Sequence, residues 1–214
     1  MIPTAASRTV TTTIQKDSPV QIDHDAVAQA LALQLADDTE WDQPPRVYWL
    51  MTTEDGVRLE EATVFAPVLA TVMERGVRLR DALRQIADQL LTLFRDGRVG
   101  AAADCLGVVV RTEAWGVETP ADPSVIADPV VAEAAALAEQ AAAGGRLSEH
   151  PDAVELATFH AVTVDEQFHW HEWQRGGIEP VRRQVDLTTT PPPGDIPRVL
   201  RRLARIVRHH QDHD

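Results

Sequence analysis

The sequence predicts an α+β fold, a mostly antiparallel sheet of four to five strands with helices packed on one face. Apolar runs of strand length occur at 47–52, at 105–115 and within 154–174. The last of these contains two strands adjacent in sequence, which favours antiparallel pairing. Other segments repeat apolar residues every three or four positions, as helices that cover a sheet do. With 214 residues, 44% of them hydrophobic, the chain can form one sizeable core.

The first part of the chain predicts an arm, a helix and a pair of strands. Residues 1–21 are rich in Thr, Ser and Ala without a clear period, and we expect a flexible or extended arm. A helix is expected over 23–38, because Asp23 can cap it and apolar residues follow at four-residue spacing. The strand at 47–52 is followed by an Asp-Gly turn and a short return strand.

Two helices and a central strand are expected next. A short helix is predicted over 67–73, and residues 78–94 form the strongest amphipathic pattern in the chain. The strand at 105–115 opens as a continuous apolar run, which is typical of a central strand. The single cysteine, Cys105, begins this run and is interpreted as a buried, unreactive thiol.

The remaining segments complete the predicted domain organisation. Residues 120–145 read as a proline-containing loop followed by an alanine-rich helix, and 154–174 as a hairpin. Both belong to an α+β core domain over 22–186. Residues 187–195 are a proline-rich linker of polyproline character, and 196–214 a basic amphipathic C-terminal helix.

Three of the eight histidines lie in the hairpin and give the chain its main hint of chemistry. If the turn has an even number of residues, as with a two-residue turn at Asp165-Glu166, then His160, His169 and His171 share one face of the sheet. A loop of three residues or a bulge moves His160 to the opposite face. In the even register the spacing suits a three-histidine site for zinc or another divalent metal, with Glu113 as the carboxylate that orients an imidazole.

Two other interpretations of the histidine face remain open. It can be the solvated side of the sheet, with Ala157, Phe159, Phe168 and Trp170 supplying the core side. It can also act as a pH-sensitive surface, because clustered imidazoles titrate near neutrality. In the first of these interpretations no cofactor is expected.

Charge and composition exclude several classes of protein. The net charge of −13 argues against a broad nucleic-acid-binding surface. No apolar run reaches transmembrane length and the N-terminus lacks the pattern of a secretory signal, so we expect no membrane association and a cytoplasmic location. No phosphate-binding glycine loop, nucleophile elbow or Cys-x-x-Cys is present.

The C-terminal helix carries a row of arginines beside an apolar stripe. They are candidates for contact with an acidic partner, or they form an exposed face neutralised by acids of the same chain. The five residues are Arg198, Arg201, Arg202, Arg205 and Arg208.

Three segments carry a resemblance to known proteins: QPPRVYWL, LGVVVRTEAWGV and HPDAVELATFHAVTVDEQF. They resemble core strands of small α+β proteins of unassigned function from actinobacteria and their phages. The resemblance implies a shared fold and carries no catalytic residue with it. It also implies a virion-associated location if the gene belongs to a phage.

We therefore expect a soluble, non-enzymatic binding or assembly protein, an accessory or structural component that contacts a protein partner or itself. The first alternative is a metal-dependent enzyme that uses the three-histidine face of the 154–174 hairpin. The second is an acidic inhibitor of nucleic-acid enzymes, because a strongly acidic surface can imitate DNA.

Overall fold

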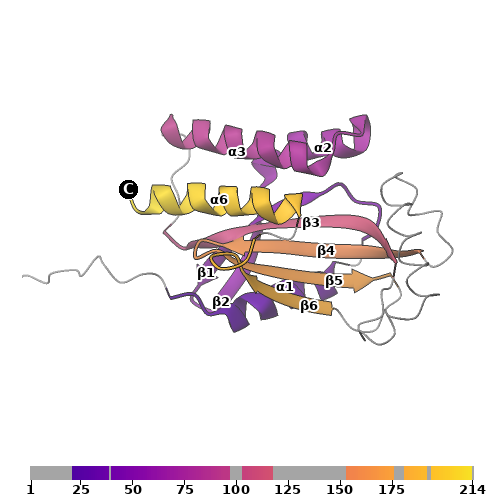
Figure 1. Ribbon diagram of the computed structural model, residues 1–214, viewed down its shortest axis with the longest axis horizontal. Coiled ribbons are helices and arrows are strands. Elements are labelled where there is room, and N and C mark those ends of the chain that lie inside the picture. Colours follow the sequence, from indigo (N-terminus) through magenta and orange to yellow (C-terminus); the bar gives the residue numbers. More distant parts are fainter. Residues whose placement is uncertain are drawn as a thin grey trace, which may run out of the picture.

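The computed structural model describes residues 21–38, 40–96, 103–117, 153–175, 181–191 and 194–213. Its centre is one six-stranded sheet in the order β2-β1-β3-β4-β5-β6, antiparallel throughout (Figure 1). The strands are β1 (Arg46–Thr53), β2 (Gly56–Glu61), β3 (Cys105–Val117), β4 (Ala153–Thr163), β5 (Gln167–Gln174) and β6 (Val181–Asp186). The predicted α+β class is confirmed, with a sheet one strand larger than the largest expected.

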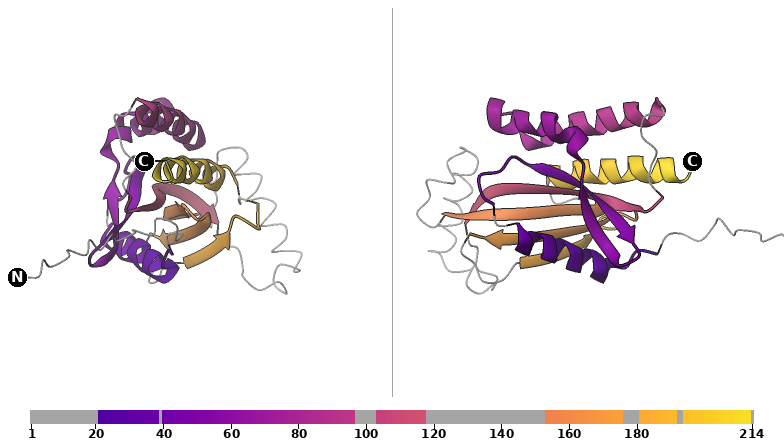
Figure 2. Two further views of the ribbon diagram at one scale, coloured as in Figure 1. Left: turned by 90° about the vertical axis from the view of Figure 1, so that its left-hand side faces the viewer. Right: turned by 180° about the vertical axis from the view of Figure 1, so that it is seen from behind.

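Helices cover both faces of this sheet, so the expectation of helices on one face is wrong. The described helices are α1 (His24–Asp37), the 3-10 turn η1 (Thr63–Phe65), α2 (Ala66–Arg75), α3 (Leu79–Arg95) and α6 (Asp195–Gln211). Helix α6 lies on β3 and β4, with α3 packed against it, whereas α1 lies on the other side (Figures 1 and 2). Because α1 touches β2 as well as β4 and β5, the sheet curves around it.

The central strands explain why both faces need a cover. Val108, Val109 and Val110 of β3 are fully buried although successive side chains point to opposite faces. The same holds for Phe159 and its neighbours on β4. A strand that is apolar on both sides must be covered on both sides, as helices cover buried strands elsewhere. We call the two sides the α6 face and the α1 face.

Local sequence signals set the bounds of the helices. Asp23 caps α1 as predicted, with its side-chain oxygen accepting hydrogen bonds from the backbone N–H groups of residues 25 and 26 at 3.0 and 3.1 Å. Helix α2 ends at Gly76, whose φ of 63° is left-handed and favours glycine. Helix α6 begins one residue before the predicted segment 196–214 and ends at Gln211, and the apolar residues of its stripe face the core.

Two segments differ from the predictions or lie beyond them. Strand β6 was missed, because VRRQVD is an edge strand with too few apolar residues to give a clear alternation. The predicted arm over 1–21, except for its last residue, and the alanine-rich helix within 120–145 lie outside the described residues. In the parts of the chain that are described, no helix is long and apolar enough to cross a membrane.

A substitution at Gly107 tests how closely β3 and β4 pair. A Cβ atom there would lie 2.5 Å from the Val162 carbonyl oxygen and 2.8 Å from the Thr163 Cα atom, and neither backbone group can rotate away. We expect Gly107→Ala to lower the free energy of unfolding by about 2–3 kcal/mol, measured by urea denaturation. Gly76→Ala is the matched control, because it meets no atom within 4 Å and costs only about 1 kcal/mol for its left-handed backbone. Equal losses in the two variants would contradict this pairing.

Candidate functional site

The loop between β4 and β5 has an odd number of residues, which decides where the hairpin histidines lie. Val162 pairs with Phe168, and the Glu166 N–H donates to the Thr163 carbonyl at 2.8 Å. Glu166 has a φ of 69°. These features define a three-residue loop, Val164–Glu166, whose last residue takes the left-handed conformation usual in such hairpins. The two-residue turn assumed for the shared histidine face is therefore wrong.

As a result the three histidines do not share a face. His160 pairs with Trp170 and points to the α6 face, whereas His169 pairs with Ala161 and points to the α1 face together with His171. His169 and His171 are each only 1% exposed, so the expectation of a solvated histidine face is also wrong. The core residues of the hairpin are divided between the two faces in the same way.

On the α1 face, His169 meets a histidine from another element. His24, the first residue of α1, places its Nδ1 atom 3.3 Å from the His169 Nε2 atom. The opposite nitrogen of His24, Nε2, lies 3.0 Å from Asp165 Oδ2. The Thr163 hydroxyl donates to the other oxygen of this carboxylate. The result is a connected chain of polar groups from the hairpin loop to the start of α1.

Burial governs the protonation of these imidazoles. It lowers the pKa of His169 to about 4, with further lowering from His24 and His171 nearby. It also lowers the pKa of His171 to about 4, assisted by Arg182. Both rings are therefore neutral at physiological pH. His171 Nδ1 is buried and has no hydrogen-bond partner.

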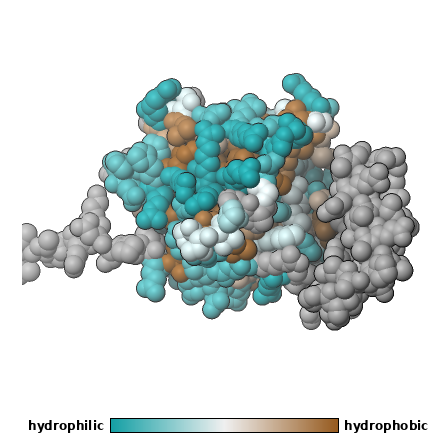
Figure 3. Space-filling view, viewed as in Figure 1, coloured by the Kyte–Doolittle hydropathy of each residue, from teal (hydrophilic) through white to brown (hydrophobic). Residues whose placement is uncertain are grey.

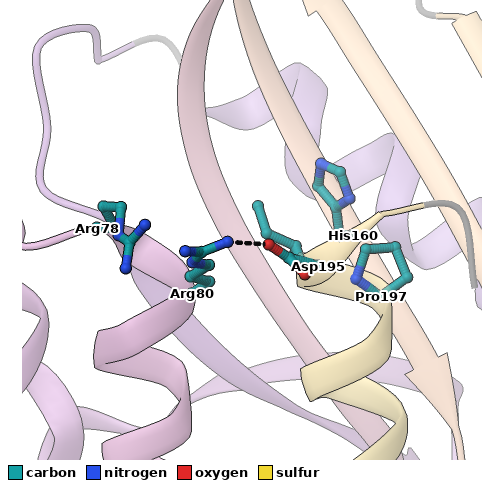
Figure 4. Close-up of a pocket in the computed structure, with 6 residues that line it drawn as sticks. Arg78, Arg80, His160, Asp195 and Pro197 are labelled. Carbon is teal, nitrogen blue, oxygen red and sulfur yellow. Dashed lines mark hydrogen bonds and ion pairs between the residues drawn. The ribbon is translucent and has the colours of Figure 1, made fainter. Parts of the chain in front are cut away.

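On the α6 face, His160 lines a cavity of about 370 Å³ with Arg78, Arg80 and the start of α6 (Figure 4). The helices α3 and α6 both begin here, at residues 79 and 195, and neither has a side-chain cap on its first N–H groups. Both positive helix ends therefore point to one place. The His160 ring stacks on Trp170 with centroids 5.8 Å apart, and burial lowers its pKa to about 4.

Polar atoms in this cavity are only partly satisfied. Arg80 Nη1 donates to Asp195, and this contact lowers the pKa of that carboxyl group. Arg80 Nε and His160 Nδ1, by contrast, are buried without a hydrogen-bond partner. An unsatisfied buried donor costs about 1–3 kcal/mol, so an acceptor in the cavity would be stabilised by Arg80.

The five arginines of α6 are all in contact with groups of the same chain. Arg201 and Arg205 both bind Glu166, and together they lower the pKa of that carboxyl group, Arg205 most. Arg202 binds Asp88 of α3 at 2.8 Å, and Arg198 binds Asp195 at 3.1 Å. Arg208 donates to the Val164 carbonyl at 3.2 Å. Figure 3 shows this side of the molecule as largely hydrophilic, with smaller hydrophobic patches between the hydrophilic residues.

Glu113, predicted to orient a metal-binding histidine, is engaged in a different contact. Its carboxylate accepts from Arg111 Nη1 and from the backbone N–H groups of Asp42 and Gln43, at 2.8 and 3.2 Å. Glu155 lies nearby and binds Arg175 at 2.6 Å.

Asp42, Glu113 and Glu155 form the one group of three ligand-type side chains, within the described ranges, whose ligand atoms lie within 4.8 Å of one another. Arg111 and Arg175 already supply positive charge there, so the cluster is accounted for by contacts within the chain.

Sequence reasoning missed His24 and Asp165 as members of a histidine cluster. His24 lies more than a hundred residues before the hairpin, and no spacing rule connects the two. Asp165 was treated only as a turn residue. The sequence did mark Cys105 correctly: it is 5% exposed, and burial raises its pKa to about 11.

The low pKa of His160 makes stability depend on pH. The folded protein holds this ring neutral down to about pH 4, whereas the unfolded chain protonates it near 6.5. The contribution of His160 to the free energy of unfolding is therefore fully present above about pH 6.5 and is lost as the pH falls toward 4. Between these pH values the free energy of unfolding should fall by up to about 3 kcal/mol less in His160→Phe than in the wild type. Urea titrations at each pH measure this difference. Arg78, Arg80 and Asp195 face the ring and are unchanged in the variant.

His209→Phe, at the exposed end of α6, serves as the control and should keep the wild-type pH dependence. Identical pH profiles for His160→Phe and the wild type would contradict the burial of the ring as the cause.

Glu166 combines a strained backbone with two ion pairs, and these two contributions can be separated. Glu166→Ala removes the contacts to Arg201 and Arg205 and keeps the left-handed backbone strain. We expect this variant to lower the free energy of unfolding by about 2 kcal/mol. Glu166→Gly loses the same contacts but relieves the strain, so it should be more stable than the alanine variant by roughly 1 kcal/mol. Thermal or urea unfolding measures both. An alanine variant as stable as the glycine variant would rule out the three-residue loop.

Comparison with known proteins adds no family to this description. No protein-family model, no curated protein and no solved structure gives a significant match to the chain. The resemblance to actinobacterial and phage proteins therefore stays a prediction, and the function is argued from the described surface and cavities.

Proposed function

We propose that this protein is a non-enzymatic binding protein that accepts an acidic segment of a partner protein on the exposed side of α6 and α3. One observation carries the proposal: α6 presents five arginines and one aspartate in a chain whose net charge is −13. Helix α6 is thus locally basic in an acidic chain. Complementary charge of this kind steers association and selects the partner.

The arginine contacts within the chain are of a kind that a partner can replace. Arg198 and Arg202 are 63% and 49% exposed, and Asp88, the partner of Arg202, is 66% exposed. Exposed ion pairs contribute only about 0–1 kcal/mol each. An incoming carboxylate can therefore exchange with them at little cost. Arg201 and Arg205 bind Glu166, which is less exposed, and these contacts support the structure of the surface.

The cavity beside His160 supports the same proposal. It lies at the N-terminal end of α6, the helix that carries the five arginines (Figure 4). A carboxylate placed there would meet the Arg80 Nε atom, which has no hydrogen-bond partner and only a 3.6 Å ion-pair contact with Asp81, and the uncapped ends of two helices. This gives the surface one open depression as an anchor point next to a row of exposed charges.

The other functions considered from the sequence have less support. A three-histidine metal enzyme requires His160 beside His169 and His171, and the register turns it away from them. A DNA-like inhibitor requires regular carboxylates on one surface, whereas α6 presents arginines. A self-associating protein would place its own acidic surface on α6, and this is a special case of the same proposal. The proposal includes an accessory role for the protein in an actinobacterium or its phage.

Binding of a polyglutamate peptide tests the proposal. We expect salt-sensitive binding to the full-length protein, and a loss of about tenfold or more in affinity for Arg198→Ala combined with Arg202→Ala, by isothermal titration calorimetry. Arg58→Ala is the matched control, because Arg58 is 64% exposed, pairs with Glu60 and lies on β2 away from α6.

Three outcomes would overturn the proposal. The first is no binding at low salt. The second is an equal loss in the control variant. The third is tighter binding of single-stranded DNA of equal charge, which would indicate a nucleic acid as the partner. Light scattering of the same samples distinguishes a separate partner from a second copy of the chain.

A further inference from the structure

We infer that a divalent transition-metal ion of the zinc class binds on the α1 face between His24 Nδ1 and His169 Nε2. This site is separate from the basic surface proposed above, which lies on the other side of the sheet. It keeps one of the histidines that the sequence suggested as ligands and adds one that the sequence gave no reason to choose.

The distance between the two nitrogen atoms is the first argument. Two imidazole nitrogens that share a tetrahedral zinc ion, each about 2.0–2.1 Å from it, lie about 3.3 Å apart. His24 Nδ1 and His169 Nε2 are 3.3 Å apart in the protein. Their rings are inclined by 26°, with centroids 5.4 Å apart, so neither ring lies between the two nitrogens.

Asp165 provides the second argument. A metal-binding histidine usually donates its other ring N–H to a carboxylate, which fixes the tautomer and directs the free lone pair at the metal. His24 Nε2 lies 3.0 Å from Asp165 Oδ2, so the Nδ1 atom of the neutral ring is left as a lone-pair donor. Asp165 is itself held by the Thr163 hydroxyl. The chain from Thr163 to His24 therefore orients the imidazole before any ligand arrives.

The same place is accessible from the surface of the protein. His24 lines a surface cavity of about 590 Å³ with Asp23, Asp25 and Gln184, which gives an ion a path from solvent. His171 is the next imidazole on this face, two residues along β5, but its nitrogens do not lie within 4.8 Å of both His24 Nδ1 and His169 Nε2, so His24 and His169 are the two protein ligands of the proposed site. The acids around the cavity favour a cation there.

A competing cluster has to be removed before the site can be tested. His209 and His213 lie at the end of α6 with ring centroids 4.3 Å apart, and such an exposed pair can hold metal adventitiously. We therefore use full-length protein without a histidine tag that carries His209→Ala and His213→Ala. Titration with Co²⁺, followed by its visible absorption, and competition with Zn²⁺ report both the stoichiometry and the ligand geometry.

We expect one equivalent of Co²⁺ with the absorption of a low-coordinate, nitrogen-ligated ion. His24→Ala should abolish that spectrum, and Asp165→Asn should weaken affinity by about 10- to 100-fold while leaving the spectrum unchanged in shape. His160→Phe, on the opposite face, should bind as tightly as the parent protein. Circular dichroism and urea unfolding establish that each variant is folded.

Two outcomes would refute the site. One is the absence of stoichiometric binding in the parent protein, which would leave His24 and His169 as a hydrogen-bonded pair only. The other is binding that survives His24→Ala or is lost equally in His160→Phe.

Discussion

The arrangement of the molecule depends on the loop Val164–Glu166 more than on any other short segment. Its odd length fixes which face each residue of β4 and β5 occupies. Its two acids then point in opposite directions: Asp165 contacts α1 on one side of the sheet, and Glu166 contacts two arginines of α6 on the other. One turn thus connects the hairpin to both covering layers, and its left-handed last residue is the conformational cost of that position.

At the other end of α1, the buried guanidinium of Arg111 attaches the helix to the sheet. Arg111 of β3 is only 1% exposed, and its guanidinium binds Asp38 at 2.7 Å, the Glu40 carbonyl at 2.8 Å and Glu113. Glu113 in turn holds the backbone N–H groups that follow Trp41. Every charge in this group has an opposite charge or a hydrogen bond, which a buried ion pair requires. Helix α1 is therefore fixed to the sheet at its first residue by His24 and at its last turn by Asp38.

Much of the secondary structure could be predicted from the sequence, because helix periodicity, a capping aspartate and an Asp-Gly turn are local signals. The bounds of α1, α3 and β3 agree with the predicted segments to within two residues. The face of each histidine could not be predicted in the same way. It depends on whether the loop has two or three residues, and the sequence VDEQ is compatible with both. Long-range partners were equally inaccessible: the contact from His24 to His169 spans 145 positions, and only the packing of α1 brings them together.

The two proposed sites share an origin in this geometry. An even loop would have gathered all three hairpin histidines on one face of the sheet. The odd loop instead places His160 beside the ends of α3 and α6, where an anion is favoured, and leaves His169 beside His24 and a carboxylate, where a cation is favoured. The opposite charge preferences of the two faces follow from the elements that cover them, arginines from α6 on one side and acids at the start of α1 on the other. A sheet that is buried on both faces can in this way hold two chemically different sites, one on each face.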